Sequence, residues 1–259
     1  QRFSALSQKG HWGFDQISII IFHLSYKIYI MPFSFVSEGF KFYGATFISF
    51  TWKTFPVFIL IGLCTATGEV LLNNENFFSW GAIFFIFTNM FLNPFILVLS
   101  VLLVNDLKSE NLKETIGYYL ISFQLFFKAF LLTLVLSLIT LVGLILFVIP
   151  GIYLASRLIL APFYLIIENT SITKALDKSW NVTKSNQIKF IYLVLFYWFI
   201  LLMPYFLVLS IVSAFLISEG ASQVPYLANI SMNALLSYFQ MVILAYPLYF
   251  VFRGIKSFE

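Results

Sequence analysis

LFFKAFLLTLVLSLITLVGLILFVIPGIYLASRLILAPFYLII, residues 125–167, carries only two charged side chains, Lys128 and Arg157. A bilayer core of about 30 Å is crossed by roughly 20 apolar residues in a helix. The segment holds two such runs, 125–148 and 151–167, with a two-residue break between them. Both faces of each run are apolar, which is not the alternation typical of a membrane strand. The segment therefore predicts a hairpin of two antiparallel membrane helices.

The rest of the chain has the same character. Of its 259 residues, 61% are hydrophobic and 10% are charged, and the mean hydropathy is +0.94. This leaves too little polar surface to cover a soluble globule. Because helices satisfy their own backbone hydrogen bonds in lipid, we expect an all-α bundle of six transmembrane helices in one domain, residues 37–256. The predicted spans are 55–72, 77–104, 125–148, 151–167, 190–217 and 230–252.

Residues 1–36 form a predicted leader ahead of this domain. Residues 17–36 are apolar, but His23, Lys27 and Pro32 interrupt them, and they lack the small-residue cleavage site of a signal peptide. We expect the leader to be interfacial or poorly ordered. One hypothesis is that Met31 is the natural start, because the organised pattern begins just after it.

Positive charge predicts the orientation in the membrane. The connections 73–76, 149–150 and 218–229 contain no Lys or Arg, whereas the alternating connections and the C-terminus do. Because cytoplasmic loops retain positive charge, we expect both termini to be cytoplasmic. The net charge of +4 comes from single basic residues beside spans, which favours anionic lipid headgroups over nucleic acid as partners. The predicted inner-leaflet lipid contacts are Lys53, Lys128, Lys174, Lys178, Lys184 and Lys189.

Three predicted cytoplasmic segments, each directly before a membrane span, carry apolar residues at helical spacing. They predict amphipathic helices that lie in the membrane interface. Each segment ends in a lysine at a span, so the chain reads as a threefold unit over 37–104, 109–168 and 171–252. The alternative is that any membrane helix has lysine and aromatic residues at its interface.

A motif between Ile145 and Asn186 carries a family resemblance. Pro150 and Gly151 predict a tight turn, Glu168 closes the arginine-bearing span, and Ser179-Trp180 lies in a cytoplasmic helix. This arrangement resembles the YciC-type family of bacterial inner-membrane proteins and, more distantly, the membrane domain of some glycerophosphodiester phosphodiesterases. The resemblance implies a multi-pass protein of the bacterial inner membrane and no particular activity. The other residues that carry it are Ile149, Ala161-Pro162 and Ala175-Leu176.

Polar groups within the spans are candidates for function. Arg157 costs about 2.5–3.5 kcal/mol at mid-membrane, so we expect a compensating group. Glu69 has a similar predicted depth, and we hypothesise a pair between the two; the alternative is that each reaches the headgroups separately. Asn89, Asn93 and Pro94 predict either a broken helix that exposes carbonyls to a substrate or a simple kink.

The sequence gives no sign of a catalytic, metal or cofactor site. His11 and His23 lie in the leader, Cys64 is the only cysteine, and the phosphate-loop, nucleophile-elbow and zinc motifs do not occur. We therefore expect a non-enzymatic protein that engages lipid in envelope homeostasis. The alternatives are a small-molecule transporter or channel, and an assembly partner for another membrane protein or for a second copy of the chain.

Overall fold

A computed structural model describes the backbone of residues 11–72, 78–184, 186–219 and 226–256. Over these residues the protein is all-helical, with 93% helix and no strands. The elements are α1 (His11–Leu72), α2 (Phe78–Phe87), a π-helical turn η2 (Thr88–Leu92), α3 (Asn93–Ser109), α4 (Thr115–Leu146), α5 (Val148–Leu158), α6 (Ala161–Ile167), α7 (Ile172–Lys184), α8 (Gln187–Glu219) and α9 (Tyr226–Lys256).

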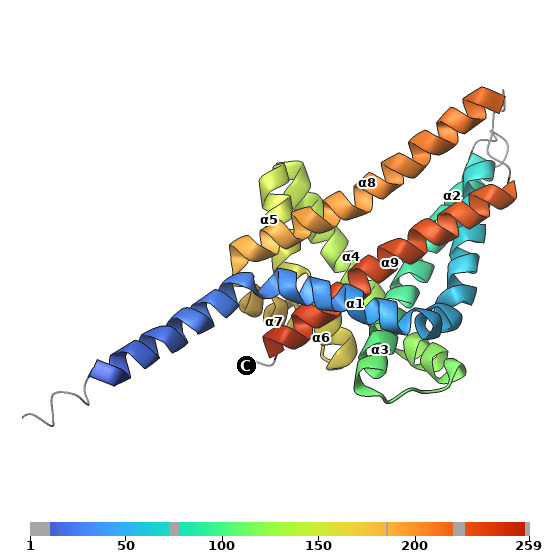
Figure 1. The fold of residues 1–259 in the computed structure, drawn as a ribbon. Coiled ribbons are helices and arrows are strands. Elements are labelled where there is room, and N and C mark those ends of the chain that lie inside the picture. Colours follow the sequence, from blue (N-terminus) through green and yellow to red (C-terminus); the bar gives the residue numbers. More distant parts are fainter. Residues whose placement is uncertain (1–10, 73–77, 185, 220–225, 257–259) are drawn as a thin grey trace, which may run out of the picture.

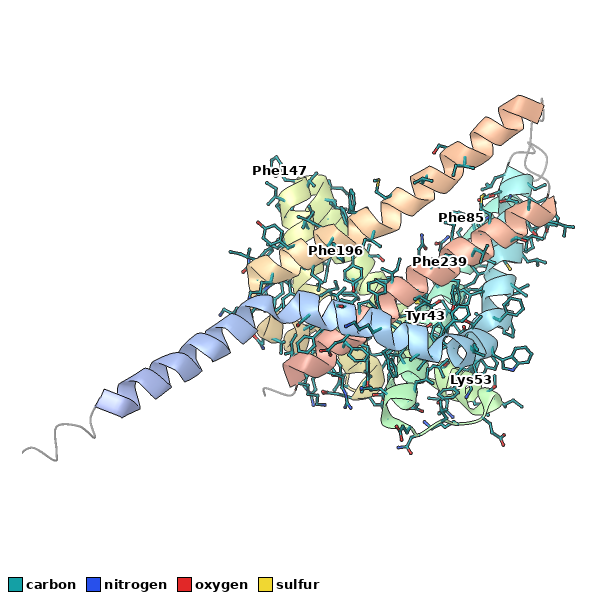
Figure 2. All side chains as sticks on the ribbon, viewed as in Figure 1. Tyr43, Lys53, Phe85, Phe147, Phe196 and Phe239 are labelled. Carbon is teal, nitrogen blue, oxygen red and sulfur yellow. The ribbon has the colours of Figure 1, made fainter. Side chains whose placement is uncertain are left out.

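Five segments within the described residues are long and apolar enough to cross a membrane. The prediction of an all-α, multi-pass membrane protein is confirmed at this level. Many large apolar side chains point outward, among them the labelled Phe85, Phe147 and Phe239 in Figure 2. Such a surface is suited to lipid. The five segments are Ser34–Leu72, Trp80–Ser109, Thr115–Leu146, Val148–Ile167 and Tyr226–Lys256.

Helix α1 is one continuous helix of 62 residues that changes direction (Figure 1). Its N-terminal arm begins at His11 among the described residues and includes most of the predicted leader, which is helical from there on. Lys53 lies at the bend that leads into the spanning arm (Figure 2). Pro56 follows within one turn, and a proline removes a backbone donor and is a usual cause of a helix kink.

Helix α9 crosses α1 and packs closely against both of its arms (Figure 1). Glycines of α1 make this approach possible. A Cβ atom on Gly39 would lie 2.6 Å from the Cα of Pro247, and one on Gly62 would lie 2.5 Å from the carbonyl oxygen of Ile230. Gly39 and Gly62 therefore serve packing within the chain.

The α4–α5 hairpin is present, but its turn differs from the prediction. The chain reverses at Phe147, which has extended backbone with φ −168° and ψ 152°. Pro150 and Gly151 instead lie in the first turn of α5, where a proline costs no helical hydrogen bond. A Cβ on Gly143 would lie 2.8 Å from the Cα of Gly151, so the two glycines allow the helices to touch.

The long second span stays helical through its asparagines. The π-helical turn η2 joins α2 to α3, and the Asn93 side chain donates to Oδ1 of Asn89 at 3.2 Å. The Asn89 side chain in turn donates to the carbonyl of Phe85 at 2.9 Å. Of the two interpretations, the structure therefore agrees with a local distortion rather than a broken helix. Such π-helical turns often occur near functional sites.

The predicted amphipathic segments differ from one another. The third forms a separate helix, α7. The first is part of α1, and most of the second, residues 115–124, is the N-terminal part of α4. Two of the three units therefore continue into their spans without a break. The threefold unit stays a prediction.

Candidate functional site

A groove of about 460 Å³ lies between α1 and α9, at the bend of α1. Its volume is within the range of about 300–1,000 Å³ typical of small-molecule sites. Tyr43 and Phe239, labelled in Figure 2, mark its two walls. The full lining is Tyr43, Phe47, Thr51, Phe55, Phe58, Ile59, Ile230, Ser231, Ala234, Leu235, Tyr238 and Phe239.

The groove opens on the apolar outer surface of the bundle. Phe55 is 54% exposed on one wall, and Leu235 is 57% exposed on the other. Both walls lie in helices that are long and apolar enough to span a membrane.

A row of hydroxyl groups forms the polar part of the lining. Tyr238 of α9 lies between two residues of α1, with its hydroxyl oxygen 3.0 Å from that of Tyr43 and 2.6 Å from Oγ1 of Thr51. Thr51 also donates to the carbonyl of Phe47 at 2.7 Å. The groove thus combines a mostly apolar surface with a small number of fixed hydrogen-bonding groups, as ligand sites commonly do.

Arg157 is buried at the end of α5, and its position differs from the prediction. Its guanidinium carbon lies 4.3 Å from the ring centre of Trp180 on α7 and 5.8 Å from that of Tyr153. Only 2% of the residue is exposed, and its Nε and Nη1 atoms have no hydrogen-bond partner among the described residues. The two aromatic rings are therefore the compensation that the structure shows for this charge.

The predicted Glu69–Arg157 pair is wrong. Glu69 accepts a hydrogen bond from the side chain of Asn229 at 2.8 Å, near the end of α1 and the start of α9. Arg157 contacts α7 instead, because α5 ends at Leu158 and brings the arginine to the side where α7 packs. The predicted depth of Arg157 assumed one continuous span over 151–167, whereas α5 ends one residue after the arginine.

Ser179 and Thr183 of α7 compensate for the break between α5 and α6. The Ser179 hydroxyl donates to the carbonyl oxygen of Arg157 at 2.8 Å, and the Thr183 hydroxyl oxygen lies 3.2 Å from that oxygen and 2.8 Å from the carbonyl oxygen of Ser179. In an uninterrupted helix this carbonyl would accept from the amide four residues later, but α5 ends at Leu158 and α6 begins at Ala161. The motif residues Ser179 and Trp180 therefore hold the backbone and the guanidinium of the same arginine.

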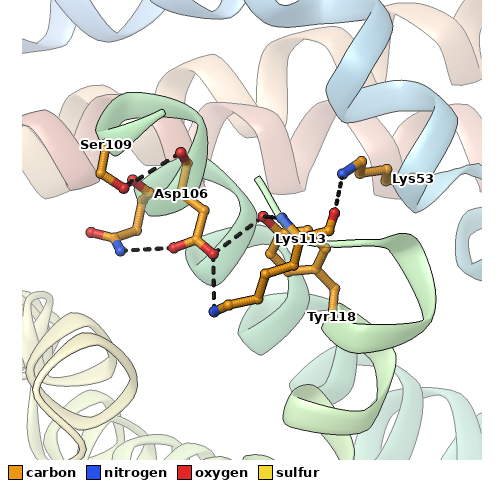
Figure 3. A network of polar contacts seen from close by, with 6 residues as sticks. Lys53, Asp106, Ser109, Lys113 and Tyr118 are labelled. Carbon is orange, nitrogen blue, oxygen red and sulfur yellow. Dashed lines mark hydrogen bonds and ion pairs between the residues drawn. The ribbon is translucent and has the colours of Figure 1, made fainter. Parts of the chain in front are cut away.

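A polar network joins the α3–α4 turn to α1 (Figure 3). Asp106 is buried and lies 3.2 Å from Lys113 Nζ, and it accepts from the Tyr118 hydroxyl at 3.2 Å. Lys53 donates to the carbonyl of Lys113 at 2.8 Å and lies 4.8 Å from the ring centre of Tyr118. Sequence reasoning missed Asp106, because a carboxylate in a short polar connection looks like a solvated residue.

Glu168 ties α7 to the end of α9. Its two carboxylate oxygens accept from Lys178 at 2.5 Å and from Lys256 at 2.8 Å. Burial by itself raises the pKa of Glu168, but the hydrogen bonds and charges of the two lysines outweigh burial and hold this pKa below its ordinary value of 4.5. The carboxylate therefore stabilises the fold above that value, and the contribution is lost as pH falls through the lowered pKa.

This bridge gives a testable pH dependence. We expect the midpoint of thermal unfolding in detergent to fall as the pH drops below about 4.5, and to fall less steeply in Glu168→Gln, which has no carboxyl group to protonate. The two proteins are compared over a series of pH values from neutral to acid. An equal loss of midpoint in both would show that the bridge is not the acid-sensitive element.

The six lysines predicted to contact the inner leaflet have different surroundings. Lys53 and Lys178 are engaged as described above, and the Lys128 side chain donates to the Asn169 side chain at 2.9 Å. Lys174 and Lys184 are exposed on α7, and Lys189 is partly buried near the start of α8. Contact with lipid stays a prediction for all six.

Among the residues that the structure describes, no three side chains of histidine, cysteine, aspartate or glutamate lie together so as to hold a metal ion. Cys64 is buried and free.

Comparisons of the chain with protein-family models, with curated proteins and with solved structures found no match. The resemblance to the YciC-type family therefore stays a prediction carried by the motif residues alone.

Proposed function

We propose that this protein is a non-enzymatic, lipid-binding membrane protein, and that the groove between α1 and α9 receives a lipid chain. The groove itself is the observation that carries the proposal. Its lining is aromatic and aliphatic except for the hydroxyls of Tyr43, Thr51, Ser231 and Tyr238. A lipid has the matching chemistry, with a long apolar part and a small polar part.

The proposed setting is a bacterial inner membrane, with six spans and both termini in the cytoplasm. The distribution of lysine and arginine supports this orientation. Contacts that link the α3–α4 turn, α7 and the end of α9 are consistent with it, because Lys108 lies 5.4 Å from the Phe250 ring centre and Lys256 contacts Glu168. These three basic regions therefore lie together, where anionic headgroups would meet them.

Transport that uses the Arg157 region and the Asn93-Pro94 region is the alternative function. A cavity of about 230 Å³ does adjoin Asn93 and Pro94, with Thr133, Ser237 and Gln240 in its lining. The helix is continuous there, however, and Arg157 is enclosed by aromatic rings. Lipid binding has the stronger support, because the groove is larger and opens directly on the apolar surface.

The proposal predicts that filling the groove displaces lipid. We expect Leu235→Trp to reduce lipid retained by the protein severalfold, because the larger ring occupies the space between α1 and α9. Native mass spectrometry of protein released from membrane particles measures the retained lipid. Leu138→Trp is the matched control, since Leu138 is similarly exposed, at 53%, but lies on α4 outside the groove lining. Equal lipid retention in the two variants would contradict the proposal.

A further inference from the structure

The donor and the acceptor of each hydrogen bond in the hydroxyl row follow from counting the hydroxyl hydrogens. Tyr43, Thr51 and Tyr238 each carry one hydroxyl hydrogen. Thr51 uses its hydrogen on the carbonyl of Phe47 at 2.7 Å. The 2.6 Å contact between Thr51 and Tyr238 must then be donated by Tyr238, and the 3.0 Å contact between Tyr238 and Tyr43 must be donated by Tyr43.

All three hydrogens are committed in this arrangement. The Tyr43 oxygen, at the end of the row, accepts no hydrogen bond from a described residue and keeps its acceptor capacity. The opposite direction would free the hydrogen of Tyr43, but Thr51 would then lose its bond to Phe47. The row therefore presents the groove with a hydrogen-bond acceptor, and a ligand gains most there if it donates.

The charges around the groove limit which chemical group of a ligand can donate this hydrogen bond. No carboxylate belongs to the described residues that line the groove, and Lys41 and Lys53 lie two residues from Tyr43 and Thr51 along α1. A cationic amine would therefore have no counter-charge in the lining. A doubly ionised phosphate monoester offers only hydrogen-bond acceptors. A neutral hydroxyl group needs no counter-charge and can donate a hydrogen bond.

We propose that the groove selects a neutral glyceride with a free hydroxyl, of the diacylglycerol type. This inference rests on the proposed lipid-binding function and adds the chemical class of the lipid. The hydroxyl donates to the Tyr43 oxygen, and one acyl chain lies along the aromatic wall. The second chain stays in the bilayer, because the groove is open on the side of Leu235 and Phe239.

The test compares dioleoylglycerol with its methyl ether, which keeps the chains but cannot donate a hydrogen bond. Both are added in equal amounts to nanodiscs of phosphatidylcholine that hold the full chain, and native mass spectrometry measures the ratio retained. One hydrogen bond predicts a preference of roughly two- to tenfold for dioleoylglycerol. Dioleoyl phosphatidate, added in a parallel arm, is expected to be retained less than dioleoylglycerol.

Two variants test the direction of the row. In Tyr238→Phe, Tyr43 loses its acceptor, so its hydrogen becomes free to donate to the ligand. In Thr51→Val, Tyr238 can donate to Tyr43, which again frees the hydrogen of Tyr43. We expect the preference for dioleoylglycerol over the ether to shrink or disappear in both, because a Tyr43 hydroxyl that donates can bind the oxygen of either ligand, so either variant suffices if the other does not fold.

Tyr246→Phe is the matched control. Tyr246 lies 3.0 Å from Oγ1 of Thr46, which donates to the carbonyl of Phe42, and neither Tyr246 nor Thr46 lines the groove. Its loss should leave the preference unchanged. Equal retention of alcohol and ether by the natural protein, or an unchanged preference in both row variants, would overturn the inference. Those results would leave the proposed function intact if Leu235→Trp still displaces lipid, so the two failures are distinguishable.

Discussion

Replacing Trp180 with alanine is expected to lower the free energy of unfolding by about 3–5 kcal/mol, one of the largest effects of any single change in the chain. Trp180 covers the buried guanidinium of Arg157 at 4.3 Å from its ring centre. Its loss removes a large packed side chain and also leaves a buried charge with less compensation. Denaturant or thermal unfolding in detergent measures the change.

A double-mutant cycle separates the two causes. We expect Trp180→Ala to cost less in an Arg157→Met background, by about 0.5–2 kcal/mol, which is the range of a cation–π contact. Arg157→Met alone should be neutral or stabilising, because it replaces a buried cation with an apolar side chain of similar length. If Trp180→Ala costs the same in both backgrounds, the ring acts only by packing.

Replacing Gly62 with leucine is the second change with a large expected effect. A Cβ at this position would lie 2.5 Å from the carbonyl oxygen of Ile230 and 2.8 Å from the Cβ of Ala234. Helices α1 and α9 must then separate, at a cost of about 1–3 kcal/mol or more. Because Ile230 and Ala234 also line the groove, we expect lipid retention to fall together with stability.

Gly44→Leu is the control for this change. Gly44 lies on the same helix, but a Cβ there would meet nothing within 4 Å. Leucine favours helix over glycine by roughly 1 kcal/mol, so this variant should be as stable as the natural protein or more so. A Gly62→Leu protein with unchanged unfolding and unchanged lipid retention would show that the close approach of α1 and α9 is not required.

The membrane helices were predictable because apolar length is a property of the local sequence. The run 125–148 falls almost wholly in α4, and only its last two residues pass the end of that helix. The next turn lies at Phe147, three residues before Pro150, since a proline fits the first turn of a helix as well as it fits a chain reversal. Boundaries of this kind depend on how α4 and α5 pack at Gly143 and Gly151, which the pattern of apolar residues does not contain.

The candidate site could not be predicted in the same way. Tyr43 and Tyr238 are 195 positions apart in the chain, and only the crossing of α1 and α9 brings their hydroxyls together. Arg157 was recognised as important because a charge in an apolar run is costly. Its predicted partner is wrong, because the sequence places Trp180 in a cytoplasmic helix but does not show that this helix folds back to cover the guanidinium.

The bend in α1 has a mechanical consequence for the groove. The groove is lined by α1 residues from Tyr43 to Ile59, so its wall includes the bend at Lys53. The outlying N-terminal arm and this wall share one unbroken backbone (Figure 1). Because this backbone is unbroken, we expect a change in the tilt of the arm to change the width of the groove between α1 and α9.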